Sequence, residues 1–137
     1  TPRYRKEELK LRNKAMELLD IVGLLEFSDS IASSLPYGHQ RKLEIARALA
    51  LNPKLLLLDE PAAGMNCEES LELISFVKEV KSKFDLTILL IEHHMDVVTG
   101  LCDAATVLNF GKTLAEGPVD DVKKEKAVIE AYLGVEE

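Results

Sequence analysis

Two adjacent carboxylates, Asp59 and Glu60, directly follow an unbroken apolar run, Leu55 to Leu58. Four leucines without alternation are typical of a strand that is buried on both faces, as in a parallel sheet. Open α/β sheets bind ligands beyond the carboxyl ends of their strands. One side chain of such a pair can approach a metal ion while the next orients or deprotonates a water molecule. The pair is therefore a candidate for metal-assisted hydrolysis, but two solvated turn carboxylates are the commoner explanation of such a pair taken alone.

A second apolar run, Leu86 to Ile91, ends at Glu92-His93-His94. Neighbouring parallel strands bring their carboxyl ends to the same edge of a sheet, so we expect His93 to lie near Asp59 and Glu60. A lone histidine is more often a satisfied polar residue than a catalyst. The spacing alone therefore makes His93 a candidate, with the neighbouring His94 as the alternative.

The stretch before the carboxylates contains a turn and a charged helix. The turn consists of Leu35, Pro36, Tyr37, Gly38, His39 and Gln40. We expect the helix over Arg41 to Leu51, where Asn52-Pro53 ends it. Gly38 leaves room at the turn, and free N–H groups at the start of a helix favour a phosphate group.

The loop from Ala62 to Asn66 follows the carboxylates. Asn66 with Glu69 three residues later is a variant of the capping box, which predicts a helix that runs to about Lys83. The remaining predicted elements are a helix over Thr1–Val22 with an apolar face at Leu11, Ala15, Leu18, Leu19 and Val22; a short helix over Met95–Cys102; a strand over Ala104–Leu108; a hairpin turn at Asn109–Lys112; a strand over Thr113–Glu116; and two helices over Val119–Lys124 and Lys126–Leu133, stopped by Gly134.

The alternation of strands and helices over Leu55 to Leu108 indicates an α/β fold with a parallel sheet. The first part of the chain is helical in pattern, which predicts a helical subdomain over residues 1–37 and a core over residues 38–137. The net charge of −7 argues against a nucleic-acid binder, which normally carries a basic patch. It does not exclude a nucleotide, because a few oriented N–H groups hold phosphates locally.

Taken together, Leu35 to Pro61 resembles the signature motif, signature helix and Walker B strand of ABC-transporter ATPases. The stretches LPYG, PAAGMN, IEHHM, AEGP and VIEAYLG resemble the ATPases of branched-chain amino-acid uptake systems in particular. The resemblance covers essentially the whole chain. It implies part of a P-loop NTPase-like parallel sheet, with an N-terminal helical subdomain and a C-terminal hairpin plus short helices.

The resemblance also implies roles for individual residues. Asp59 corresponds to the Walker B aspartate, which is linked to Mg²⁺, and Glu60 to the catalytic glutamate. His93 corresponds to the switch histidine, which reaches the γ-phosphate of ATP. An acidic residue usually follows that histidine, so His94 departs from the family pattern, and a shift of the switch by one residue stays open.

Two further stretches correspond to nucleotide-binding parts of the family. The turn from Leu35 to His39 takes the place of the LSGGQ motif, which serves the nucleotide held by the opposite subunit of a head-to-tail dimer. Only Leu35 and Gly38 match that consensus, and His39 stands where glutamine is usual. The loop that contains Gly64 and Asn66 takes the place of the D-loop, with Asn66 in place of the usual aspartate.

The P-loop sequence G-x-x-x-x-G-K-S/T does not occur in the chain. Gly111-Lys112-Thr113 looks like its end, but Thr106 stands where the first glycine belongs. The chain thus resembles the C-terminal portion of an ABC ATPase, and we expect it to be inactive in isolation. Either another polypeptide supplies the missing half, or the chain is part of a longer product.

The resemblance implies ATP binding and hydrolysis, with Mg²⁺, in the nucleotide-binding subunit of an importer for branched-chain or related hydrophobic amino acids. The implied partners are a second ATPase subunit and membrane permease subunits, with no nucleic acid. The implied location is cytoplasmic, peripheral on the inner face of the cell membrane. The alternative is a non-catalytic interaction module that docks to a permease or to a complementary chain.

Overall fold

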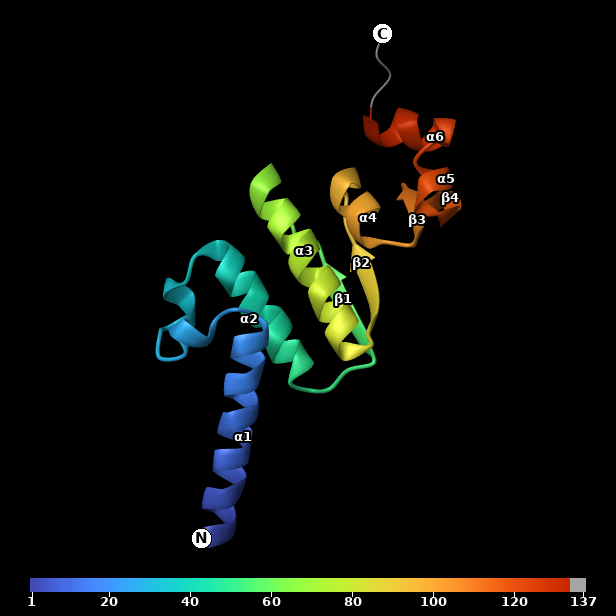
Figure 1. The fold of residues 1–137 in the computed structure, drawn as a ribbon. Coiled ribbons are helices and arrows are strands. Elements are labelled where there is room, and N and C mark those ends of the chain that lie inside the picture. The colour runs from blue at the N-terminus through green and yellow to red at the C-terminus, as the bar shows by residue number, and fades with distance from the viewer. Residues whose placement is uncertain (134–137) are drawn as a thin grey trace.

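The computed structural model describes residues 1–133, so the predicted stop at Gly134 lies outside the described residues. The chain begins with helix α1, Pro2–Ile21, which projects from the rest of the molecule (Figure 1). Gly23 ends it with φ +70°, a backbone conformation that glycine adopts without strain. Two single turns of 3₁₀ helix, Leu25–Phe27 and Ala32–Ser34, lead to helix α2, Tyr37–Leu49.

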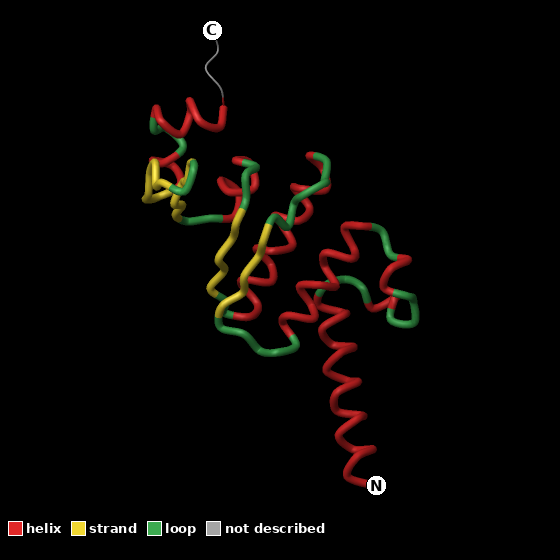
Figure 2. The backbone as a smooth tube through the Cα atoms, turned by 180° about the vertical axis from the view of Figure 1, so that it is seen from behind, coloured by secondary structure: helices red, strands yellow, loops and turns green. Residues whose placement is uncertain are grey.

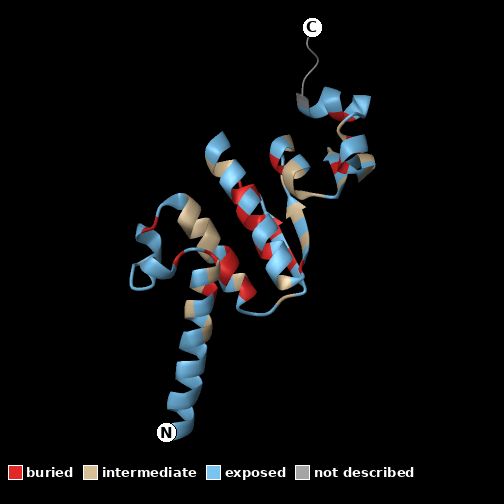
Figure 3. Cartoon of the chain, viewed as in Figure 1, coloured by how far each residue is buried: buried red, intermediate tan, exposed pale blue. Residues whose placement is uncertain are grey.

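Only the C-terminal end of α1 belongs to the core (Figure 3). Leu18 is buried, whereas Leu11 is 66% exposed. Leu11 and Ala15, predicted on the same apolar face as Leu18, are exposed, because no other described element covers the first turns of α1. Lys14 links the C-terminal half of α1 to α2, since its Nζ donates a hydrogen bond to the carbonyl of Ala50 just after α2 (2.9 Å).

Strands β1, Leu55–Asp59, and β2, Thr87–Ile91, form a parallel pair joined by helix α3, Cys67–Phe84. The register places Leu55 opposite Thr87 and Asp59 opposite Ile91, so both strands end at one edge. Helix α3 covers one face of the pair and carries Leu73, Ile74, Phe76, Val77 and Val80 into the core. This βαβ unit confirms the predicted α/β class and the predicted parallel pair.

The opposite face of the β1–β2 pair is exposed. Leu55 and Leu57 of β1 are 51% and 65% exposed, and Leu89 and Ile91 of β2 are 57% and 59% exposed. The prediction of strands buried on both faces was therefore wrong for the described residues. A run of leucines is compatible with burial on both faces of a sheet. Among the described elements α3 covers one face of this pair, so the side chains that alternate to the other face remain in solvent.

The third predicted strand does not join the parallel pair. Strand β3, Ala104–Asn109, pairs with β4, Lys112–Pro118, as an antiparallel hairpin that forms a second sheet (Figure 2). Phe110 and Gly111 make its turn with φ +47° and +74°, which confirms the predicted hairpin. The seven-residue helix α4, Met95–Leu101, connects β2 to this hairpin.

The C-terminal segment packs on the hairpin. Helices α5, Val119–Val122, and α6, Lys126–Val128, are followed by a π-helical turn, Ile129–Leu133. Val107, Val122 and Val128 form a small core separate from the main one. Two short helical segments were predicted here, and the structure confirms them with a shorter first helix.

A cavity of about 750 Å³ lies between the two sheets. Residues 88–92 of the β2 segment line one side and residues 104–108 of β3 line the other. The edges of β2 and β3 that flank it carry no strand partner among the described residues. Within residues 1–133, no helix has both the length and the hydropathy needed to span a bilayer.

Candidate functional site

The candidate site lies where β1 and β2 end. The N–H of Glu60 donates a hydrogen bond to the carbonyl of Ile91 (2.8 Å), which extends the parallel pairing by one residue. Nδ1 of His93 lies 3.4 Å from Oε1 of Glu60, and the two side chains are 55% and 50% exposed. Asp59 is the last residue of β1 and is exposed. The prediction that these three residues share one edge of the sheet is confirmed.

Glu60 holds a strained backbone conformation. Its φ of +43° lies in the left-handed region, which costs a residue other than glycine about 1–3 kcal/mol. Its carbonyl accepts a hydrogen bond from the N–H of Ala63 (3.1 Å), which closes a tight turn just after the strand. The turn sends the chain away from the sheet and leaves the Glu60 carboxylate at the open edge.

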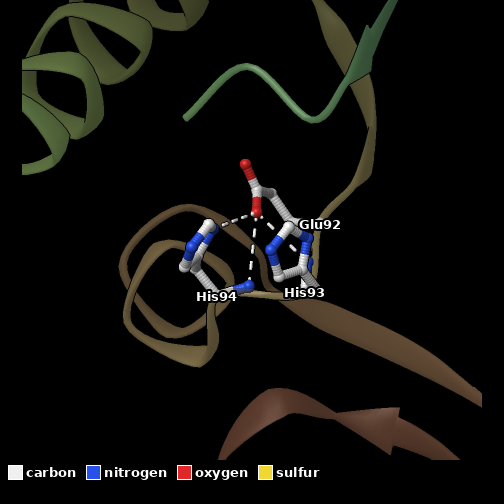
Figure 4. Close-up of side chains that lie close together, drawn as sticks. All are labelled: Glu92, His93 and His94. Atoms are coloured by element: carbon white, nitrogen blue, oxygen red, sulfur yellow. Dashed lines mark hydrogen bonds and ion pairs between the residues drawn. The ribbon is translucent and has the colours of Figure 1, made fainter. Parts of the chain in front are cut away.

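The carboxylate of Glu92 joins this turn to the end of β2, and Figure 4 shows its contacts to His93 and His94. Its Oε1 accepts a hydrogen bond from the N–H of Ala62 (3.0 Å). Its Oε2 accepts from the N–H groups of His93 (3.1 Å) and His94 (3.2 Å), and lies 3.0 Å from Nδ1 of His94. The Glu92 side chain is 0% exposed. We call this set of contacts the Glu92 clasp.

Burial and hydrogen bonding act on Glu92 in opposite directions. Burial raises the pKa of its carboxyl group, but the hydrogen bonds from Ala62, His94 and His93 lower that pKa below the ordinary value of 4.5. Glu92 is therefore a buried carboxylate that is charged at neutral pH. The sequence analysis did not assign Glu92 a role, although it continues, one residue past the end of β2, the alternation by which Ile88 and Leu90 are less exposed than their neighbours.

The site offers two kinds of ligand atom to a metal ion. Ligand atoms of Glu92, His93 and His94 lie within 4.8 Å of one another. The oxygens of Glu92 already accept hydrogen bonds, however, and imidazoles suit transition metals better than Mg²⁺. Mg²⁺ prefers oxygen ligands and keeps several waters. The exposed carboxylates of Asp59 and Glu60 meet that requirement.

The predicted nucleotide-binding turn is already part of a helix. Helix α2 begins at Tyr37, whereas the prediction placed its start at Arg41, so that Gly38, His39 and Gln40 lie in its first turn. Pro36 stands before the helix, and its carbonyl accepts the N–H of Gln40 (3.0 Å). A proline is favourable there because its fixed φ suits a helix start.

The first turn of α2 leaves an open surface. It has no side-chain cap, and the position of Gly38 has free space where a side chain would extend. The Gln40 side chain instead donates to the carbonyl of the buried Leu35 (2.8 Å). The His39 ring packs on Phe27 (5.1 Å between centroids), and its Nδ1 is buried without a partner among the described residues.

The start of α2 also contacts the loop after β1. The hydroxyl of Tyr37 donates to the carbonyl of Ala63 (2.9 Å), and the Arg41 guanidinium donates to that hydroxyl (2.7 Å). Gly64 adopts φ +76° in this loop. The oxygen of the Asn66 side chain accepts from the N–H of Glu69 (2.9 Å), which confirms the predicted capping box and occupies that oxygen.

Comparison with known proteins adds to this geometry. Residues 1–63 match the ABC transporter family, and residues 112–137 match the family described as branched-chain amino acid ATP-binding cassette transporter. The chain is 43% identical over 134 residues to the high-affinity branched-chain amino acid transport ATP-binding protein LivG of Escherichia coli, and 41% identical over 134 residues to BraF of Pseudomonas aeruginosa. These alignments cover 98% of this chain and 52% of each relative, so the chain spans about half the length of the curated relatives it matches.

Solved structures show the same fold. The ADP conformation of MJ1267, an ATP-binding cassette of an ABC transporter, matches with a TM-score of 0.82 and 33% identity over 92% of this chain and 51% of that chain. A nucleotide-free ATP-binding cassette from an ABC transporter matches with a TM-score of 0.80 and 32% identity over the same shares.

Proposed function

Because the chain belongs to the ABC-transporter ATP-binding family, we propose that it forms the catalytic-carboxylate half of an ATP-hydrolysing importer subunit. The transported substrates are branched-chain or related hydrophobic amino acids, as the names of LivG and BraF support. The observation that carries the proposal is the contact of 3.4 Å between Glu60 and His93 at the common end of two parallel strands. This contact places the Glu60 carboxylate, which can accept a proton, beside the His93 imidazole, which can orient that carboxylate.

In this proposal Glu60 holds and polarises, or deprotonates, the water that attacks the γ-phosphate of ATP. General-base assistance of this kind contributes about 10²–10⁴-fold to a rate. His93 lies beside Glu60 and contacts the γ-phosphate as the switch histidine. Asp59 is the residue that would hold Mg²⁺ or its waters, and Mg²⁺ when bound neutralises charge that develops on the phosphates.

The nucleotide of a second subunit is the proposed ligand of the α2 start. Within the turn from Leu35 to Gln40, Tyr37, Gly38 and His39 present the N–H groups of the first turn of α2, and such groups favour phosphate oxygens. Gly64 and Asn66 lie in the loop that Tyr37 contacts through Ala63, so we place them at the same subunit boundary. The proposed assembly is a head-to-tail dimer that acts on membrane permease subunits from the cytoplasmic side.

The open cavity between the sheets favours a second candidate function. Its two flanking strand edges and the exposed Leu57 and Leu89 form an apolar surface that a complementary polypeptide would cover. The chain would then act, without catalysis of its own, as a module that binds such a polypeptide or a permease. The missing P-loop makes the isolated chain inactive in both cases.

A chimaera tests the proposed function. The half of E. coli LivG that this chain does not match is joined to the chain, and phosphate release is measured with ATP and Mg²⁺. We expect hydrolysis that Glu60→Gln lowers about 10²–10⁴-fold while ATP-dependent dimerisation persists, since glutamine keeps the shape but accepts no proton. The control is Glu68→Gln, the same change at an exposed residue of α3. Near-normal hydrolysis by Glu60→Gln would overturn the assignment of Glu60.

A further inference from the structure

We propose that Glu92 is a positioning residue that holds the Glu60 turn and the His93–His94 segment in a single arrangement. The proposal rests on the proposed function for its catalytic consequence, and on the Glu92 clasp for its structure. Each oxygen of the carboxylate serves a different segment, since Oε1 accepts from Ala62 and Oε2 accepts from both histidine N–H groups. A displacement of either segment therefore breaks contacts to one oxygen.

The turn after β1 depends on this clasp. Pro61 has no N–H, so the segment from Glu60 to Ala63 has only three backbone donors. The N–H of Glu60 pairs with the carbonyl of Ile91, and the N–H of Ala63 pairs with the carbonyl of Glu60. The remaining donor, the N–H of the buried Ala62, pairs with Glu92. Within the described part of the chain, Glu92 thus supplies the only side-chain contact to these donors, next to the strained φ of Glu60.

The clasp also fixes the second segment. The Oε2 atom of Glu92 holds two consecutive N–H groups and the His94 ring. The rings of His93 and His94 lie against each other with centroids 4.1 Å apart, so anchoring one ring limits the other. His94, which departs from the family pattern, is therefore tied to Glu92, while His93 remains beside Glu60.

A buried carboxylate is an unusual choice for packing alone. Its desolvation is unfavourable, and only several charge-assisted hydrogen bonds offset it. Glutamine has one acceptor oxygen and cannot satisfy donors on both sides. Two segments need acceptor oxygens here, which explains why a glutamate stands at this position. Its neutral isostere, glutamine, would lose the contacts to one of the two segments and release that segment from the other.

Amide titration of the chain tests the clasp directly. The amide shifts of Ala62, His93 and His94 are followed by NMR from pH 7 to below the ordinary carboxyl pKa of 4.5. We expect one shared inflection below that value, absent in Glu92→Gln and retained in Glu68→Gln. The carboxylate of Glu60 and the imidazoles of His93 and His94 lie nearby, and the variant separates their effects on the amide shifts from that of Glu92. Unrelated inflections, or amides that exchange as in an unfolded chain, would refute the clasp.

Kinetics of the LivG chimaera test the positioning role. We expect Glu92→Gln to lower kcat about 10–100-fold with little change in the KM for ATP, since small misplacements of catalytic groups have effects of this size. Added to Glu60→Gln, the same change should lower kcat by less than it does alone, because Glu92 acts in part through Glu60. Independent, multiplicative losses would overturn the positioning role. A chimaera without any ATPase activity would refute the proposed function and this kinetic consequence, while the shared inflection still decides the clasp.

Discussion

Oε1 of Glu60 and Nδ1 of His93 lie 3.4 Å apart although helix α3 and the whole of β2 separate them in the chain. The parallel register of β1 and β2 places both residues just beyond the same edge. Both side chains are about half exposed, so solvent screens their mutual attraction. Their proximity is therefore a consequence of the sheet and of the Glu92 clasp, and it is available for chemistry on a third group.

This relationship predicts different results for the two histidines. In the LivG chimaera, His93→Ala should lower turnover about 10–100-fold with a smaller effect on the affinity for ATP, because His93 is the ring beside Glu60. His94→Ala removes one contact to Glu92 and should lower turnover less. Steady-state phosphate release and nucleotide titration give both quantities. Normal turnover in His93→Ala together with loss in His94→Ala would move the switch by one residue.

The chain without its complement should bind ATP weakly or not at all. A P-loop supplies most of the phosphate contacts in this class of protein, and the sequence contains none. The measurement is a titration with a fluorescent ATP analogue at physiological Mg²⁺, with the chimaera as the positive control. Micromolar affinity that unlabelled ATP competes away would contradict this prediction.

The exposed face of β1 and β2 predicts self-association of the chain. Leu55, Leu57, Leu89 and Ile91 form an apolar surface on one side of the parallel pair, and such surfaces associate in water. We expect a mass in sedimentation that rises with concentration and that Leu57→Lys reduces.

A matched control is available for the association experiment. Leu71 on α3 is 63% exposed, close to the 65% of Leu57, but lies outside this face. Leu71→Lys should leave the concentration dependence unchanged. A well-protected monomer at all concentrations, measured by sedimentation and hydrogen exchange, would count against the prediction.

Local patterns predicted much of this structure. The apolar runs before Asp59 and before Glu92 predicted two parallel strands, and their common end followed from the topology of the sheet. The capping box at Asn66 and the hairpin turn at Gly111 depend on residues within a few positions of each other. Such features are set by local backbone chemistry, which a sequence displays directly.

Other features depend on neighbours that the sequence does not display. The sequence predicted the hairpin partner of β3 but also placed this strand in the parallel sheet, whereas within residues 1–133 it pairs with β4 alone. The glycine at position 38 suggested a turn before the helix, whereas Pro36 starts the helix earlier. Glu92 resembles any charged residue after a strand until its two oxygens are seen to serve segments that are distant in the chain.

The Glu92 clasp predicts a specific loss of stability in acid. The folded pKa of Glu92 lies below 4.5, so the carboxylate stabilises the fold fully above that pH, and this contribution is lost as the pH falls through the folded pKa. Glu92→Gln should therefore be less stable than the original chain near neutral pH, with a difference that shrinks below pH 4.5. Urea unfolding at a series of pH values measures this difference. The control is Glu79→Gln, which removes an exposed ion pair to Lys83 and should change stability little at any pH, because solvent screens such pairs. A difference between Glu92→Gln and the original chain that stays constant or grows on acidification would contradict a charged Glu92 at the centre of the clasp.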